Sequence, residues 1–157
     1  MNIDGRELRD ALGRFATGVC VITCIHQQKP LGITVNSFAS VSLDPPLVLW
    51  SLQNDSESYE AFASAGHFAV NILSKDQQHL SNLYAKKGDH LLRDEHFRIG
   101  KCGSPVMRDA LTTLECELEI SHEGGDHLII LGRVRDMTTR PSGKPLLFFS
   151  GAYRELH

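Results

Sequence analysis

Hydrophobic and polar positions alternate with a period of two in the second half of the chain. From residue 114 to residue 120, apolar side chains occupy the even positions and glutamates occupy the odd ones. Such alternation is typical of a strand with one buried and one solvated face. The turn at residues 124–126 contains two glycines, and residues 127–134 follow as an apolar run. Because glycine readily adopts the positive φ of a tight turn, the pattern predicts an antiparallel hairpin.

Shorter runs predict five further strands. They are rich in β-branched or apolar residues and are bounded by turn residues such as proline, glycine and glutamine. The expected strands are residues 19–25, 31–35, 47–52, 68–73 and 146–149, the last of these closing the fold.

Three segments carry helix signals. The spacing of Asp4 and Glu7 is that of a capping box, and Leu8, Leu12 and Phe15 then recur at helical spacing. This predicts a helix of about three turns with one buried face, ended by Gly18. Two more helices are expected at residues 57–65 and, after a second capping box, 74–88. Because strands succeed one another through hairpins, the order favours a six-stranded or similar antiparallel barrel with peripheral helices over a doubly wound sheet.

Composition narrows the class of protein. A chain of 157 residues is expected to form a single domain, residues 1–157. Its net charge of −3 argues against a nucleic-acid partner, which requires a basic surface. No signal peptide and no apolar run of the ~20 residues that span a bilayer are seen, so a soluble, cytoplasmic protein is expected.

Cysteine and histidine offer no metal site. The four cysteines form no C-x-x-C pair, and Cys20 and Cys24 would lie about 13 Å apart on one strand, so buried free thiols are expected. None of the eight histidines has metal-ligand spacing, and His90 and His96 are expected to be solvated loop residues. Common catalytic motifs are also absent, which indicates that a cofactor carries any chemistry.

The segment GITVNSFASVSLDPP, residues 32–46, resembles the signature of the flavin reductase family, whose fold is the FMN-binding split barrel. Four other parts of the chain resemble that family in the same order: residues 15–19, residues 68–74, residues 125–127 with 131–134, and residues 145–153. Two positions depart from the family pattern, since Trp50 replaces a smaller side chain and Ala152 replaces a basic one. The resemblance implies a mainly β, antiparallel Greek-key split barrel.

It also implies a flavin site. Thr34, Val35, Asn36 and Ser37 would line the flavin, with Ser40 nearby, and short polar side chains on an ordered turn suit the hydrogen-bonding edge of an isoalloxazine. An ordinary loop capped by Asn and Ser is the alternative.

The phosphate would lie near four residues that end a strand and begin a helix: Ser51, Leu52, Ser56 and Ser58. Hydroxyl groups and free helical amides can bind an anion, and Lys86 and Lys87 could add charge. Simple helix capping is the alternative there.

His127 and Tyr153 complete the expected site. By resemblance, His127 borders the space where nicotinamide stacks on the flavin, and Tyr153 lies near its mouth. Hydride transfer depends on orientation rather than on a strong base, so His127 is assigned to positioning. A surface histidine and a core or interface aromatic residue are the alternatives.

The implied function is reduction of FMN or FAD by NADH or NADPH in a homodimer, with the reduced flavin passed to a separate monooxygenase. The alternatives are a barrel that retains its flavin as an oxidase or electron-transfer protein, a non-catalytic flavin- or haem-binding module, and a structural barrel without ligand.

Overall fold

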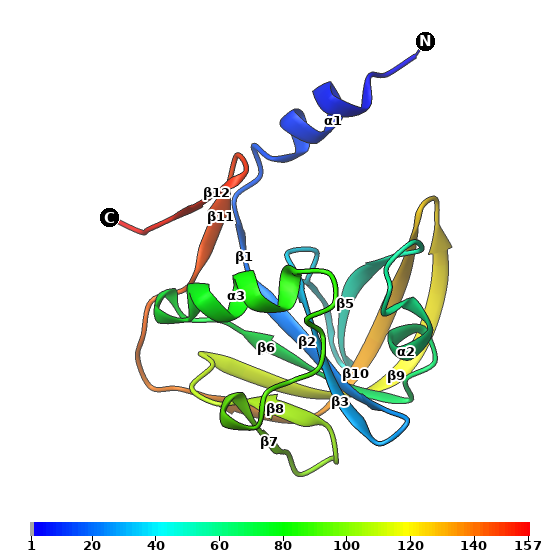
Figure 1. Cartoon of the computed structure of the whole chain (residues 1–157), viewed down its shortest axis with the longest axis vertical. Coiled ribbons are helices and arrows are strands. Elements are labelled where there is room, and N and C mark those ends of the chain that lie inside the picture. The colour runs from blue at the N-terminus through cyan, green and yellow to red at the C-terminus, as the bar shows by residue number, and fades with distance from the viewer. Residues whose placement is uncertain (1) are drawn as a thin grey trace.

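Seven antiparallel strands form the main sheet of the protein, whose computed structural model describes residues 2–157 (Figure 1). The strand order is β3-β2-β6-β9-β10-β5-β4. The strands are β2 (Cys20–His26), β3 (Lys29–Val35), β4 (Ala39–Leu43), β5 (Pro46–Gln53), β6 (His67–Ile72), β9 (Thr112–Gly124) and β10 (His127–Thr139). Hairpins connect β2 to β3, β4 to β5 and β9 to β10.

Smaller elements surround this sheet. A three-stranded sheet contains β1 (Thr17–Gly18), β11 (Leu147–Phe149) and β12 (Ala152–Arg154), and a two-stranded sheet contains β7 (Phe97–Ile99) and β8 (Pro105–Met107). The helices are α1 (Gly5–Leu12), α2 (Tyr59–Ala63) and α3 (Gln78–Ala85), with 3₁₀ turns at Lys75–Gln77 and Asp94–His96. None of these described helices is long and apolar enough to cross a membrane.

Two apolar clusters hold the elements together. In the first, Trp50 of β5 contacts the ring edges of Phe62 and Phe68 at centroid distances of 5.7 and 6.0 Å. This cluster also receives side chains from β2, β9 and β10, so the sheet curves around it and α2 packs against it. The second lies between β2 and α3 and includes Val21 and Tyr84. Strand β2 serves both clusters because its successive side chains point to opposite faces.

The sequence patterns predicted most of this sheet correctly. Each of the seven expected strands is present, and the long β9–β10 hairpin turns at Gly125, whose φ is +67°. Asp4 caps α1 by accepting hydrogen bonds from the N–H groups of Arg6 and Glu7. The capping box between Ser74 and Gln77 is confirmed, whereas at α1 only the Asp4 half of the expected box is formed among the described residues. The patterns do not predict β1, β4, β7, β8 or β12, and β12 rather than residues 146–149 is the last strand.

The expectation of a buried face on the first helix is wrong. Helix α1 ends at Leu12, no residue in it is buried, and Phe15 beyond it is 79% exposed. Gly18 lies in β1, which pairs with β11. As Figure 1 shows, α1 extends from the body beside the β11–β12 hairpin. The helix therefore has little of its own chain to pack against.

The alternation in β9 is also imperfect. Glu115 occupies a position predicted to be solvated, yet it is only 4% exposed. Its carboxylate accepts hydrogen bonds from the backbone N–H groups of Lys101 and Cys102, at 3.2 and 2.9 Å. The loop before β8 thus covers this part of the sheet and compensates the buried charge.

Candidate functional site

A pocket of about 510 Å³ opens where the ends of β3, β5 and α3 meet. Its volume lies within the range of roughly 300–1,000 Å³ typical of small-molecule sites. The lining residues are Ile33, Thr34, Val35, Asn36, Ser37, Ser51, Leu52, Gln53, Asp55, Ser56, Glu57, Ala85, Lys87, His90 and His127.

Eight of the residues predicted for the site lie together here, although they come from three separate segments. They are Thr34, Val35, Asn36, Ser37, Ser51, Leu52, Ser56 and His127. The loop after β3 reaches β5, and β5 pairs with β10, which begins at His127. The sheet therefore brings together side chains that are up to 93 positions apart, from 34 to 127.

Two serines connect the loop after β3 to β5. The Ser37 hydroxyl donates to the carbonyl oxygen of Ser51 at 3.2 Å and accepts from the Ser51 N–H at 2.9 Å. Thr34 donates its hydroxyl to the carbonyl oxygen of Ser81 in α3 at 2.7 Å. These bonds fix the backbone of the loop, so Ser37 and Thr34 act first as supports for the pocket wall.

The same loop carries donors without protein partners. Among the described residues, the backbone N–H groups of Asn36 and Ser37 and the side chain of Asn36 form no hydrogen bond with the protein. Amide donors at the rim of a pocket are available to the acceptor atoms of a ligand. Residues 34–37, together with Ser51 and Leu52, form the uncharged wall of the pocket. This wall suits a flat heterocycle with oxygen and nitrogen acceptors along one edge.

His127 has an orienting partner that the sequence reasoning missed. Its Nδ1 lies 2.7 Å from an Asp126 carboxylate oxygen, and this hydrogen bond holds the pKa of Asp126 below its usual range. The hairpin turn itself is attached to the end of β5, because Asn54 N–H donates to the carbonyl oxygen of Asp126 at 2.9 Å. With Nδ1 engaged, the ring keeps Nε2 for a ligand.

Three predicted site residues lie outside the pocket lining. Ser40 is exposed on β4, and Ser58 is buried just before α2. The Tyr153 hydroxyl lies 2.6 Å from the Ser81 hydroxyl and donates to Asn82 at 3.0 Å. Tyr153 is thus attached to α3, and it reaches the wall only indirectly, since Ser81 also accepts from Thr34.

The two departures from the family pattern leave the pocket intact. Trp50 is fully buried in the first apolar cluster and points away from its neighbour Ser51, as alternate residues of a strand do. Ala152 lies on β12 and is not among the lining residues.

The charged wall of the pocket is formed by Asp55, Glu57, Lys87 and His90, together with Gln53 and Ala85. Most of this wall was not predicted from the sequence. His90 was expected to be solvated, but its side chain is only 12% exposed and pairs with Glu57 at 3.0 Å.

His96, the other histidine expected to be solvated, is half-buried too. Its Nδ1 lies 2.7 Å from the Tyr84 hydroxyl, and burial lowers its pKa. No group of three metal-ligating side chains occurs in residues 2–157.

These features fit a flavin nucleotide. The uncharged wall offers amide and hydroxyl groups to a ring, whereas Lys87 and Ser56 offer a cation and a hydroxyl to a phosphate.

Comparison with known proteins also points to a flavin-binding protein. Residues 12–157 match the family model of the flavin reductase like domain. The chain is 45% identical to the FMN reductase (NADH) SmoA of Agrobacterium fabrum over 150 residues, which is 96% of this chain and 85% of that protein. It is 37% identical to HsaB, the reductase subunit of a flavin-dependent monooxygenase of Mycobacterium tuberculosis, over 96% of this chain and 82% of that protein.

A solved structure shares the complete fold. The NADH:FAD oxidoreductase SgcE6 of Streptomyces globisporus, solved in complex with NAD and FAD fragments, superposes with a TM-score of 0.91 at 34% identity. The match covers all of this chain and 97% of that one, and it confirms the mainly β split-barrel class. The fold, the pocket and these matches together establish that the chain belongs to the flavin reductase family.

Proposed function

We propose that this protein is an NADH-dependent flavin reductase that reduces FMN or FAD and supplies the product to a separate monooxygenase. The observation that carries the proposal is the convergence of the signature loop, the end of β5 and His127 on one pocket. Relatives named as an NADH-dependent FMN reductase and as a monooxygenase reductase subunit support it.

The residues of the pocket would divide the task of holding the flavin. When bound, the flavin would supply the redox chemistry by accepting a hydride from the reduced nicotinamide. Asn36 and the free N–H groups beside it would bind the edge of the ring, and Ser51 and Leu52 would back it. Ser56 and Lys87 would face the phosphate.

His127 would position the nicotinamide. The hydrogen bond to Asp126 limits rotation of the imidazole, and the ring lies at the pocket lining. Because orientation of two stacked rings supplies most of the rate advantage in such a transfer, no strong base is needed. Removal of the His127 side chain is therefore expected to raise the KM for NADH more than it lowers kcat.

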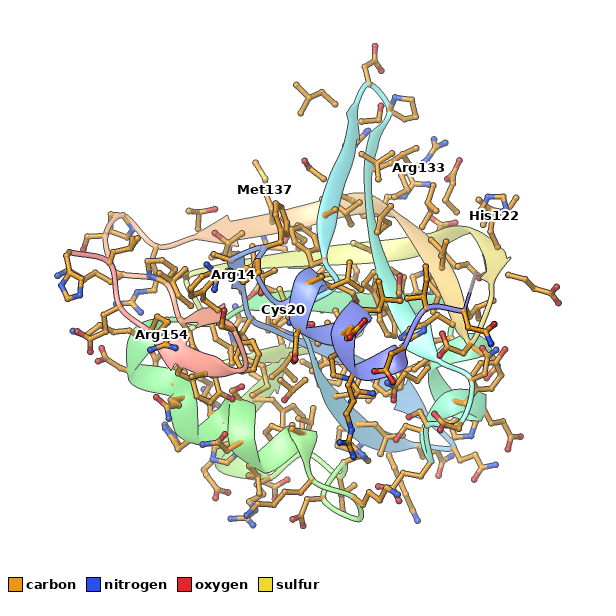
Figure 2. All side chains as sticks on the ribbon, turned by 90° about the horizontal axis from the view of Figure 1, so that it is seen from above. Arg14, Cys20, His122, Arg133, Met137 and Arg154 are labelled. Atoms are coloured by element: carbon orange, nitrogen blue, oxygen red, sulfur yellow. The ribbon has the colours of Figure 1, made fainter. Side chains whose placement is uncertain are left out.

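We propose further that the protein is a homodimer. Apolar side chains that the chain leaves exposed gather on its projecting parts: Leu8, Leu12 and Phe15 near α1, Val41 and Leu43 on the β4–β5 hairpin, and Ile120 and Met137 on the β9–β10 hairpin. Figure 2 shows the β4–β5 hairpin standing out from the body, near Arg133. A second copy would cover apolar surface that otherwise faces water.

Sedimentation equilibrium tests the homodimer, and a mass of twice 17.4 kDa is the expected result. Replacing Leu43 at the hairpin tip with Glu should weaken association, whereas replacing the exposed Lys29 with Glu should not. A monomeric wild-type protein at micromolar concentration would overturn the proposal.

NADH oxidation by the purified protein, with and without excess FMN, tests the reductase function. Turnover should rise with FMN and saturate. If the protein retains flavin and shows no increase with added FMN, it is instead a flavin-holding oxidase or electron-transfer protein. Flavin binding with no turnover of NADH or NADPH would indicate a non-catalytic module.

A further inference from the structure

Glu57 connects the two loops of the charged wall. Its carboxylate accepts a hydrogen bond from the backbone N–H of Gly88 and lies 3.0 Å from Nε2 of His90. Glu57 belongs to the loop after β5, whereas Gly88 and His90 belong to the turn after α3. One carboxylate therefore fixes the turn at two points.

His90 connects the same turn to β3. Its Nδ1 lies 3.0 Å from the carbonyl oxygen of Gly32, and its own carbonyl oxygen accepts from the Gly32 N–H at 2.8 Å. Leu92 N–H donates to the carbonyl oxygen of Pro30 at 2.9 Å. Residues 90–92 thus run against β3, the strand that leads into the uncharged wall.

The position of His90 between two acceptors has a chemical consequence. One ring nitrogen faces a carbonyl oxygen and the other faces a carboxylate, and neither oxygen can donate. Both ring nitrogens of His90 are therefore engaged by the protein, and the Glu57 carboxylate is held by His90 and Gly88.

Lys87 directly precedes Gly88, the first of the two points at which Glu57 holds the turn. It is the only lysine or arginine in the pocket lining, and within residues 2–157 no carboxylate lies within 4 Å of its ammonium group. Its neighbour Lys86 does not line the pocket. A cation that is positioned at a pocket wall but not neutralised is suited to an anionic ligand.

We propose that Glu57 and His90 are positioning residues that hold Lys87 against the phosphate of the flavin nucleotide. The proposal rests on the proposed function, because it assumes that flavin occupies this pocket. Two parts of the pocket then recognise two parts of the flavin. The uncharged wall binds the ring of any flavin, and the Glu57–His90 pair sets the preference for phosphorylated flavins.

Riboflavin provides the test, because it has the flavin ring without the phosphate. The dissociation constants of FMN and riboflavin are measured from flavin fluorescence in the absence of NADH. Lys87→Met should weaken FMN binding by about tenfold, equivalent to about 1.4 kcal/mol, and leave riboflavin binding unchanged. Lys86→Met is the matched control and should leave both unchanged.

The positioning role is tested by coupling to Lys87. Glu57→Ala and His90→Ala should each weaken FMN binding severalfold with little effect on riboflavin, and Glu57→Gln, which keeps an acceptor oxygen, should recover part of the loss. In the background of Lys87→Met, neither alanine substitution should weaken FMN binding further, because both act through Lys87.

Two results would overturn the proposal. One is an unchanged FMN affinity in Lys87→Met, and the other is an equal loss of FMN and riboflavin binding in Glu57→Ala and His90→Ala, which would make the pair merely structural. Failure of the proposed function is distinguishable, because a wild-type protein that binds FMN more tightly than riboflavin but never oxidises NADH would contradict only the reductase activity.

Discussion

The two walls of the pocket use different kinds of interaction. The uncharged wall stands on the ends of β3 and β5 and is held by hydroxyl bonds to backbone, from Ser37 to Ser51 and from Thr34 to Ser81. The charged wall stands on two loops and is held mainly by the carboxylate of Glu57. In the proposed function, the uncharged wall would place the flavin ring, and the charged wall would provide charge at the phosphate end, which needs less exact placement.

This difference predicts what a defect in each wall should do. Loss of order in the uncharged wall should weaken every flavin equally, because every flavin has the same ring. Loss of charge on the other wall should weaken only the flavins that carry phosphate. Comparing FMN with riboflavin therefore reports which wall a substitution has changed.

The largest effect is expected at Gly32, which supports both walls. A Cβ atom there would lie 2.7 Å from Cδ2 of Leu92 and 3.2 Å from Cγ1 of Val21. Gly32→Val should cost about 1–3 kcal/mol of folding stability by overpacking and should abolish tight binding of both flavins. Urea unfolding measures the stability, and fluorescence titration measures the binding.

Gly66→Ala is the control for this prediction, because a Cβ atom at Gly66 would meet no atom within 4 Å. It should leave the unfolding midpoint and both affinities close to those of the wild type. If Gly32→Val lost FMN binding but kept riboflavin binding, the uncharged wall would not depend on the packing of β3 against residues 90–92.

A smaller effect is expected at Ser37. Ser37→Ala removes the acceptor for the Ser51 N–H and the donor to the Ser51 carbonyl oxygen. If ordering the loop on binding costs about 1 kcal/mol more in the variant, FMN and riboflavin should both bind roughly fivefold more weakly. Isothermal titration calorimetry with each flavin checks the equality.

Ser40→Ala tests the same region from outside the pocket. Ser40 was expected near the flavin but is exposed on β4 and does not line the pocket, so its removal should leave both affinities unchanged. A loss comparable to that of Ser37→Ala would mean that β4 contacts the flavin, for example across a dimer.

The uncharged wall could be predicted from the sequence, and the charged wall could not. Residues 34–37 lie at the end of a recognisable strand and belong to a signature of consecutive residues, so both the strand pattern and the resemblance identify them. Glu57, Lys87 and His90 lie in loops, up to 33 positions apart, and meet only because the segment after α3 returns along β3. No periodic pattern encodes such a return.

The same contrast explains the errors in the fold. Alternation and apolar runs predicted six of the seven strands of the main sheet, all except β4, because their burial is set by neighbouring strands. They did not predict that a loop would bury Glu115, or that α1 would have little of its own chain to pack against. These outcomes depend on the packing of distant segments rather than on local periodicity.

Asp126 allows a prediction about the nicotinamide side of the pocket. Asp126→Asn replaces the carboxylate that orients His127, and the expected result is a KM for NADH raised about threefold with flavin affinities unchanged. The hydrogen bond from His127 lowers the pKa of Asp126. The bond therefore contributes fully at pH values above the usual pKa of an aspartate, and its contribution is lost as the pH falls through the lowered pKa of Asp126.

Steady-state kinetics as a function of pH check this expectation. The wild-type KM for NADH should rise toward that of Asp126→Asn only in acid, and the variant should lack this rise. An equal increase in the KM for FMN would show that His127 belongs to the flavin wall and not to the nicotinamide side.

The smallest effect concerns the thiols, which report on the order of the uncharged wall without taking part in binding. Burial raises the pKa values of Cys20, Cys24 and Cys116 to about 12, so these thiols should resist alkylation in the native protein, while the partly exposed Cys102 should react slowly. Labelling of Cys102 should leave FMN and riboflavin affinities unchanged, because it lines neither wall.

Two of the buried thiols can then distinguish a local defect from a general one. Across the β2–β3 hairpin, Cys20 pairs with Val35 at the uncharged wall, whereas Cys24 pairs with Leu31, four residues earlier on β3. Ser37→Ala should therefore increase alkylation of Cys20, measured by peptide mass spectrometry, and leave Cys24 protected. Equal labelling of both thiols would mean that the whole hairpin opens, and that the two walls are not independent in stability.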